Sequence, residues 1–464
     1  MADESRIHLI GIGGSGLSAI ARLLLEMGRT VSGSDRVESP FTRQLQAAGA
    51  TVAIGHDPLN VQGAGLVVRS SAIPDDNPEV VAARAAGIPV LKRADFLGSL
   101  MEGKSGIAVA GTHGKTTTTA MIAWVLSALD QDPSFICGGV LTDLGTNARA
   151  GKGSAFIVEA DEYDRMFLGL KPTIEVITNV EHDHPDCYPT PADFQASFIQ
   201  FVRLLPPGGA LIACAEDAGA CAVMEEADKI GKTVLAYGLR PAPGSERVRD
   251  VFTEVLSPNQ VGGFTFSASV LGQAASVALR VPGHHNVRNA LAALTVAELL
   301  SLPLEEAAEA LGRFNGVGRR FEVRGEVNGI AVVDDYAHHP TEIAATLSAA
   351  RARYPGRRIW TVWQPHTYSR VRALFSDFCQ AFEGADEVVV TEIYAAREPR
   401  QEFSAAEIVH VMLRPAHFIP ELKDVSNFLL SHLRPGDVLL VLSAGDADQV
   451  STEVLARLKE VPNG

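Results

Sequence analysis

The chain has 464 residues, 46% of them of hydrophobic type, and a formal net charge of −15 at pH 7. This length predicts about three domains with substantial cores. The acidic balance and the lack of a basic block argue against nucleic acid as a partner. The sequence holds no run of about 18 apolar residues, so we expect no membrane span.

The N-terminal sequence and the cysteines indicate a cytoplasmic protein. The opening MADESRIHLI carries two acids early, which does not fit a secretory signal. The cysteines form no C-x-x-C pair, so we expect reduced core thiols and neither a disulfide framework nor a zinc site. They are Cys137, Cys187, Cys214, Cys221 and Cys379.

The first segment begins with a strand at residues 7–10, which runs directly into GIGGSG at residues 11–16. The next strand ends at Asp35, so a glycine fingerprint is followed by an acid, as in dinucleotide-binding folds. Any ligand with a pyrophosphate could use the same turn, and Asp35 could also be a solvated strand-end acid. Later strands at residues 52–54, 66–69 and 89–91 alternate with Ala-rich helices, which predicts a small parallel α/β domain.

The second segment begins with an apolar strand at residues 107–110, the turn Gly111–Gly114, and Lys115-Thr116 at the start of an apolar-periodic helix. Strand, glycine turn, Lys-Thr and helix is the plan of a phosphate-binding loop. The backbone N–H groups and the lysine would hold phosphates, and Thr116 could ligate magnesium. Val109 stands where the strict pattern has glycine, and the plain alternative is a glycine turn with a surface lysine. ATP is the expected ligand.

Two acid-rich strings follow strands of the same segment. EADEYD at residues 159–164 follows one strand, and EHDH at residues 181–184 follows a strand predicted at 176–180. Because ligands collect at the carboxyl ends of parallel strands, these groups could hold magnesium on a triphosphate, although either string could be a solvated loop. Residues 251–281 indicate irregular antiparallel strands inserted on the sheet, and residues 283–300 an amphipathic helix.

A third segment again alternates strands (residues 330–333, 359–362, 387–390 and 438–442) with helices. Its polar residues gather at two strand ends, DDYAHHP at 334–340 and QPHTYSR at 364–370, where packing alone would not require them. We place the domain boundaries at residues 1–103, 104–316 and 317–464.

Nine strings, in order, resemble the Mur ligases: GIGGSGLSAIA, SSAIPDDNPEV, GTHGKTTTT, EADEYD, TNVEHDHPD, GHHNVRNALAA, NGVGRRFE, DDYAHHPTE and QPHTYSR. The resemblance covers nearly the full chain. It implies an α/β protein of three domains: an N-terminal Rossmann-like domain for a UDP-sugar, a central ATPase with a mostly parallel sheet, and a C-terminal Rossmann-like domain. It also implies ATP-dependent ligation of L-alanine to the lactyl carboxylate of UDP-N-acetylmuramate, with Mg²⁺, in peptidoglycan synthesis by a monomer or weak dimer.

Residue roles also follow from the resemblance. Lys115, His184, Arg320, His338 and Arg370 would be catalytic, and Thr116, Glu159 and His184 would hold magnesium. Nucleotide contacts would come from Gly111, Thr112, His113, Gly114, Lys115, Thr116, Thr117, His285, Asn286, Asn289, Arg320 and Asp335. UDP-sugar and amino-acid contacts would come from Gly13, Gly14, Ser15, Gly16, Asp35, His56, Ser70, Ser71, Arg149, Asn179, Tyr336, His338 and Arg370.

The chain departs from the family at Thr367, where many members carry arginine, so one positive charge near the amino acid is missing. Residues 181–188 contain no lysine, whereas other Mur ligases use a carbamylated lysine near the second metal. That fits the alanine-adding activity and equally a ligase that recycles muropeptides. From other classes, an NAD-dependent dehydrogenase would explain residues 11–35 but not the phosphate loop. A P-loop GTPase or kinase would explain the phosphate loop but not the first domain.

Overall fold

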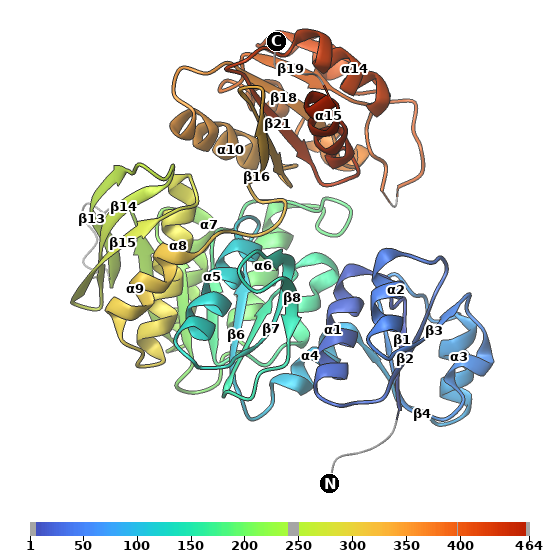
Figure 1. The fold of residues 1–464 in the computed structure, drawn as a ribbon. Coiled ribbons are helices and arrows are strands. Elements are labelled where there is room, and N and C mark those ends of the chain that lie inside the picture. Colours follow the sequence, from blue (N-terminus) through green and yellow to red (C-terminus); the bar gives the residue numbers. More distant parts are fainter. Residues whose placement is uncertain (1–5, 240–249, 397, 461–464) are drawn as a thin grey trace.

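The computed structural model describes residues 6–239, 250–396 and 398–460. Its strands form three sheets of five, ten and six strands, one for each part of the chain. Figure 1 shows the central part beside the first and beneath the third. The predicted three-domain α/β class is confirmed, whereas the exact boundaries stay predictions. The N-terminal residues of the opening sequence lie outside the described ranges. No helix within those ranges is long and apolar enough to span a membrane.

The first sheet is parallel throughout, with the strand order β3-β2-β1-β4-β5. Its first strand is central, so the GIGGSG loop lies at the middle of the carboxyl edge. The elements are β1 (Arg6–Ile10), α1 (Ser15–Glu26), β2 (Val31–Asp35), α2 (Pro40–Ala47), β3 (Thr51–Ile54), η1 (Pro58–Val61), β4 (Ala64–Arg69), α3 (Pro78–Ala85), β5 (Val90–Lys92) and α4 (Arg93–Met101).

The central sheet has the order β15-β14-β13-β12-β11-β10-β6-β9-β7-β8. Its elements are β6 (Ser105–Ala110), α5 (Lys115–Ala128), β7 (Ser134–Leu141), β8 (Thr146–Arg149), β9 (Ala155–Glu159), η2 (Tyr163–Gly169), β10 (Ile174–Ile177), α6 (Pro191–Val202), β11 (Ala210–Cys214), α7 (Ala218–Lys229), β12 (Thr233–Gly238), β13 (Val251–Pro258), β14 (Phe264–Val270), β15 (Gln273–Leu279), α8 (His284–Leu299) and α9 (Leu304–Arg313).

Two details of the central sheet differ from the sequence expectation. The strand predicted at residues 176–180 ends at Ile177, because the chain then turns to bond the phosphate loop through Thr178 and Asn179. Strands β13 to β15 are not irregular: they form an antiparallel meander with one bulge. Its first strand pairs in parallel with β12 and so extends the main sheet.

The third sheet has the order β16-β17-β21-β18-β19-β20, and only β16 is antiparallel to its neighbour. Its elements are β16 (Glu322–Val327), β17 (Ile330–Asp335), α10 (Pro340–Arg353), β18 (Ile359–Gln364), α11 (Tyr368–Ala373), α12 (Phe375–Gln380), β19 (Glu387–Val390), α13 (Ala406–Val409), β20 (Ala416–Phe418), α14 (Leu422–His432), β21 (Val438–Ser443) and α15 (Asp448–Glu460).

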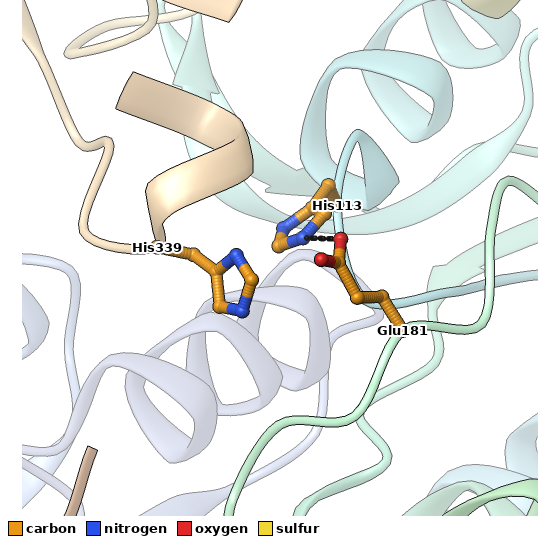
Figure 2. A group of neighbouring side chains, drawn as sticks. All are labelled: His113, Glu181 and His339. Atoms are coloured by element: carbon orange, nitrogen blue, oxygen red, sulfur yellow. Dashed lines mark hydrogen bonds and ion pairs between the residues drawn. The ribbon is translucent and has the colours of Figure 1, made fainter. Parts of the chain in front are cut away.

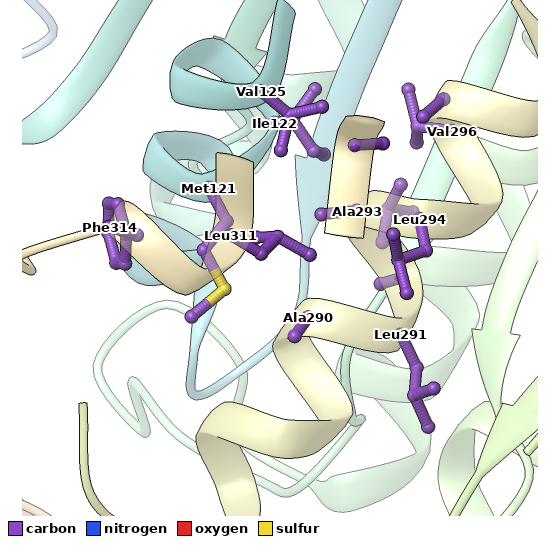
Figure 3. Close-up of a cluster of buried hydrophobic side chains, with 14 of the residues drawn as sticks. Met121, Ile122, Val125, Ala290, Leu291, Ala293, Leu294, Val296, Leu311 and Phe314 are labelled. Atoms are coloured by element: carbon purple, nitrogen blue, oxygen red, sulfur yellow. The ribbon is translucent and has the colours of Figure 1, made fainter. Parts of the chain in front are cut away.

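The largest apolar cluster holds the central helices against their sheet. Helices α5, α8 and α9 pack together through buried side chains, among them Met121, Ile122, Leu291 and Leu311 (Figure 3). Replacing one such buried side chain by alanine typically lowers a protein's free energy of unfolding by about 2–5 kcal/mol. The cluster therefore fixes the N-termini of α5 and α8, and both of these termini lie beside the phosphate loop.

Candidate functional site

A cavity of about 1050 Å³ lies where the three domains meet. The first domain lines it with Ser15 and Gly16 of the GIGGSG loop. The central domain contributes the phosphate loop and the acids that follow β9, and the third domain contributes the two polar elbows predicted from sequence. The lining thus includes Lys115, Thr116, Glu159, His184, Arg320, Tyr336, His338 and Arg370.

The phosphate loop needs glycine at two positions. Gly111 has φ +137°, and a Cβ there would lie 2.0 Å from Thr178 Oγ1. Gly114, with φ +81°, is the N-cap of α5, so the first N–H groups of this helix stay open to a ligand. Thr117 lies in the first turn, and Asn179 braces the loop by accepting the His113 N–H at 2.9 Å.

Lys115 is paired with an acid that is not among the site residues predicted from the sequence. Its Nζ lies 2.9 Å from the Glu162 carboxylate, which is buried. Burial would lower the pKa of Lys115, but Glu162 outweighs it and raises the pKa. Burial would likewise raise the pKa of Glu162, but Lys115 and His184 lower it. Both groups are therefore ionised at neutral pH, with the ammonium fixed at the helix N-terminus.

Thr116 and Glu159, two of the residues predicted to hold magnesium, lie in contact. Thr116 Oγ1 lies 2.9 Å from Glu159 Oε1, and Arg320 Nη2 lies 3.3 Å from the same hydroxyl. A hydroxyl and a carboxylate are hard oxygen ligands, so these donors fit Mg²⁺. His184, the other residue predicted to hold magnesium, contacts Glu162, with its Nε2 3.4 Å from Glu162 Oε1.

Arg370 forms a buried ion pair across the domain gap. Its Nε and Nη2 donate to Asp183 Oδ1 and Oδ2 at 3.0 and 3.1 Å, and its Nη1 lies 3.1 Å from His366 Nδ1. Burial would raise the pKa of Asp183, but Arg370 lowers it far below the usual range. The arginine therefore has a partner in the central domain, whatever it contacts in the cavity. Thr367, at the departure from the family, also lines the cavity.

Glu342, in the first turn of α10, connects the third domain to the phosphate loop. Its Oε1 lies 3.1 Å from His113 Nδ1, and its Oε2 accepts the His338 N–H at 3.0 Å. Burial would lower the pKa of His113, but Glu342 and Glu181 raise it to about 9. Burial lowers the pKa of His338 to about 3, so this imidazole is neutral in the cavity.

Some predicted first-domain contacts are used inside the protein. Asp35 Oδ2 accepts the Gly13 N–H at 2.8 Å, which ties the GIGGSG loop to β2. His56 Nδ1 lies 3.1 Å from Ser34 Oγ, and Ser70 packs against Gly11. Within the described residues, the cavity lining does not include Gly13, Gly14, Asp35, His56, Ser70 and Ser71, nor Arg149 and Asn179.

Of the predicted adenine and ribose contacts, Asn289 lies against the phosphate loop, and the described cavity lining includes none of His285, Asn286, Asn289 and Asp335. Asn289 Oδ1 would lie 3.0 Å from a Cβ on Gly114, and Asn286 Nδ2 donates to the Pro282 carbonyl at 2.7 Å. Burial lowers the pKa of His285 to about 4. Asp335 accepts backbone N–H groups on both oxygens, from Phe321 and Ala337 at 2.7 Å each, so it shapes its own loop.

The sequence reading missed Glu342, Asp183 and Glu162 as site residues. A signal existed for Glu342, because H-P-T-E at residues 339–342 has the spacing of a capping box, and the structure forms one. Asp183 and Glu162 stand inside the acid-rich strings that were recognised. Sequence spacing could not show which acid of each string would pair with a cation.

A phosphate loop with a hydroxyl–carboxylate pair and a third domain over the cavity defines the class of a nucleotide-dependent enzyme. Three family models match consecutive parts of the chain: "Mur ligase family, catalytic domain" (6–105), "Mur ligase middle domain" (109–297) and "Mur ligase, glutamate ligase domain" (319–445). The chain belongs to the Mur ligase family and is an ATP-dependent, ADP-forming ligase. The predicted family membership is confirmed.

Relatives and solved structures agree over nearly the whole length. The chain is 46% identical over 460 residues to a UDP-N-acetylmuramate–L-alanine ligase of Bordetella petrii, covering 96% of this chain and 97% of the relative. It is 44% identical to a namesake from Geobacter sp. strain M21, covering 98% of each. A crystal structure of a UDP-N-acetylmuramate–alanine ligase from Thermotoga maritima aligns with TM-score 0.80 at 29% identity, covering 98% of this chain and 99% of that one. A murein peptide ligase from Psychrobacter arcticus aligns with TM-score 0.71 at 27% identity, covering 99% and 100%.

Proposed function

We propose that this chain joins L-alanine to the lactyl carboxylate of UDP-N-acetylmuramate, with conversion of ATP to ADP and phosphate, in peptidoglycan synthesis. The observation that carries the proposal is the single cavity shared by the GIGGSG loop, the phosphate loop and the His- and Arg-containing elbows. Three substrates must meet for such a reaction, and three domains line that cavity. The curated relatives with full-length coverage are named for this activity.

The chemistry explains why these side chains are needed. A carboxylate is a poor electrophile, and transfer of a phosphoryl group to its oxygen creates a leaving group. The alanine amine then attacks the acyl phosphate, and phosphate leaves the tetrahedral intermediate. Two anions must approach each other in the first step, so cations and N–H donors have to neutralise their charge.

The central residues would serve the phosphoryl transfer. Lys115 and the loop N–H groups would hold the β- and γ-phosphates, and Arg320 would contact the γ-phosphate. Thr116 and Glu159 would hold Mg²⁺, with His184 at a second ion; bound magnesium neutralises phosphate charge. His285, Asn286, Asn289 and Asp335 would lie around adenosine.

The outer domains would bind the other two substrates. Residues 1–103 would take the UDP-sugar, with its pyrophosphate on the N–H groups of Ser15 and Gly16, because the predicted N–H groups of Gly13 and Gly14 already bond Asp35 and Gly11. Tyr336, His338 and Arg370 would surround alanine. Because burial keeps His338 neutral, it would bring no positive charge of its own to the attacking amine.

The test uses the full chain with ATP, Mg²⁺ and UDP-N-acetylmuramate. ADP release should require L-alanine and should vanish in Lys115→Ala. A preference for a tripeptide over L-alanine would support a peptide-recycling ligase, which the similarity to a murein peptide ligase and the missing arginine at Thr367 make the second candidate. Calorimetric binding of NADH in place of UDP-N-acetylmuramate would overturn both.

A further inference from the structure

Three side chains from separate parts of the chain meet in the gap between the central and third domains: His113, Glu181 and His339 (Figure 2). His113 belongs to the phosphate loop, Glu181 follows β10, and His339 is the N-cap of α10. One ligand atom from each lies within 4.8 Å of the other two. We propose that this trio binds a divalent transition metal, separately from the magnesium site proposed at Thr116 and Glu159.

His339 supplies independent support. The residue is 2% exposed, yet its Nε2 has no hydrogen-bond partner among the described residues. Its Nδ1 accepts the Thr341 N–H at 3.3 Å, a long bond. A buried polar nitrogen without a partner is costly. Coordination through Nε2 would satisfy it; the ring proton would then lie on Nδ1, and the Thr341 N–H would have to turn away from this nitrogen.

His113 has the surroundings of a metal-binding imidazole. Its Nε2 lies 3.0 Å from Glu181 Oε2, and its Nδ1 lies 3.1 Å from Glu342 Oε1. A metal ion would replace the proton between Nε2 and Glu181, and Nδ1–H would donate to Glu342. Such a carboxylate behind a ligating histidine fixes its tautomer and orientation. Thr341 Oγ1 holds Glu181 in the same way, 2.8 Å from Oε1.

The donor set selects the kind of metal. Two imidazoles and one carboxylate suit Zn²⁺, Co²⁺ or Ni²⁺, whereas Mg²⁺ and Ca²⁺ prefer oxygen ligands alone. Three protein ligands leave a position for water or another oxygen ligand. Because His339 comes from the third domain and the other two ligands from the central domain, a bound ion would link the two domains and favour their closed arrangement.

The experiment titrates Co²⁺ into the EDTA-stripped full chain, without nucleotide or magnesium, and records visible absorption. We expect the strong bands of a low-coordinate cobalt site to saturate at one equivalent and to disappear when Zn²⁺ is added. His339→Ala and Glu181→Gln should each weaken cobalt binding by at least about tenfold, since they remove a ligand.

Two control variants keep the assignment specific. His182→Ala removes the histidine beside Glu181. The Nε2 of His182 is bonded to the Tyr188 carbonyl at 2.8 Å, so this variant should leave the cobalt absorption bands unchanged. Glu159→Gln, at the magnesium site, should also leave them unchanged. Thermal unfolding without metal shows whether each variant is folded. If His339→Ala does not fold, the cobalt titration of Glu181→Gln tests the proposal. The metal proposal would be overturned if the wild-type protein showed no cobalt bands, or if the bands persisted in both ligand variants. Neither result would bear on the proposed ligase activity.

Discussion

Two glycine loops in this chain share one plan and differ in their chemistry. Each follows a strand that lies between two parallel neighbours and opens a helix, α1 in the first domain and α5 in the second. The first loop contains no cation, and its Gly13 N–H is engaged by Asp35. The second contains Lys115, with Glu162 as its partner and Thr116 against Glu159.

The difference shows that a glycine fingerprint alone does not define a ligand. In the first loop, Asp35 braces the turn instead of projecting toward a ribose, which weakens the dehydrogenase interpretation. A cation, Arg93, reaches this loop from α4, and its Nη1 would lie 1.7 Å from a Cβ on Gly16. In the second loop, the cation is Lys115 of the loop itself, and the oxygens of Thr116 and Glu159 are of the kind that ligate magnesium.

The largest effect should come from removing the cation of the second loop. Lys115→Ala should lower kcat by about 10³-fold, because a preorganised charge on the transferring phosphoryl group is lost. Steady-state ADP release measures this loss, and circular dichroism checks the fold. Lys152→Ala, on an exposed residue, is the matched control. Near-normal turnover in Lys115→Ala would remove the distinction between the two loops.

Arg370→Ala tests whether the elbow in the third domain serves alanine. We expect the KM for L-alanine to rise by about one and a half to three orders of magnitude, consistent with a lost charge-assisted pair of about 2–4 kcal/mol. The KM for ATP should change much less, because the second loop holds the phosphates. Initial-rate kinetics with each substrate varied in turn gives both constants.

The Asp183–Arg370 pair provides the control for that experiment. Asp183→Asn keeps the arginine but removes its charged partner across the gap. It should raise the KM for L-alanine less than Arg370→Ala does. If the KM values for ATP and alanine rose equally in both variants, the pair would serve domain closure. The alanine carboxylate would then need another partner.

Glu159→Gln should have a smaller effect, confined to magnesium. An amide is a weaker ligand for a hard dication than a carboxylate, so the Mg²⁺ concentration for half-maximal rate should rise on the order of tenfold. A magnesium titration at saturating ATP measures it, with Glu162→Gln for comparison. If the magnesium titration of Glu159→Gln were unchanged, we would infer that other acids of the same string hold the metal.

The sequence could predict the fold class and much of the two loops. Hydrophobic strands and glycine turns are local signals, so strand–loop–helix units at residues 7–26 and 105–128 follow from them. The pairing of Thr116 with Glu159 is implied by the family resemblance, and the structure explains it, because β6 and β9 are adjacent parallel strands whose carboxyl ends meet.

Contacts between domains could not be predicted in this way. Arg370 and Asp183 are 187 residues apart, and His113 and Glu342 are 229 apart. Both pairs depend on how the third domain sits over the central one, which no local pattern encodes. Asp335 shows a second limit: a strand-end acid has the same sequence signal whether it contacts a ligand or, as its bonds here show, its own backbone.

The smallest expected effect concerns the support beneath the first loop. Glu79 is fully buried beside β2: Ser34 Oγ donates to its Oε2 and Asn60 Nδ2 to its Oε1, both at 2.5 Å. Burial would raise the pKa of Glu79, but bonds from His8, Ser34 and Asn60 lower it from 4.5 to about 2. A lowered carboxyl pKa stabilises the fold above the unfolded-state value and stops doing so as pH falls through the folded-state value. Glu79→Gln should therefore cost about 1–3 kcal/mol at pH 7, and its deficit should shrink between about pH 4.5 and 2. Thermal unfolding of both proteins across that range measures the difference, and Glu38→Gln, on an exposed residue, serves as control. A deficit independent of pH would mean that the carboxylate's charge does not support this loop, in contrast to the charged pairs of the second.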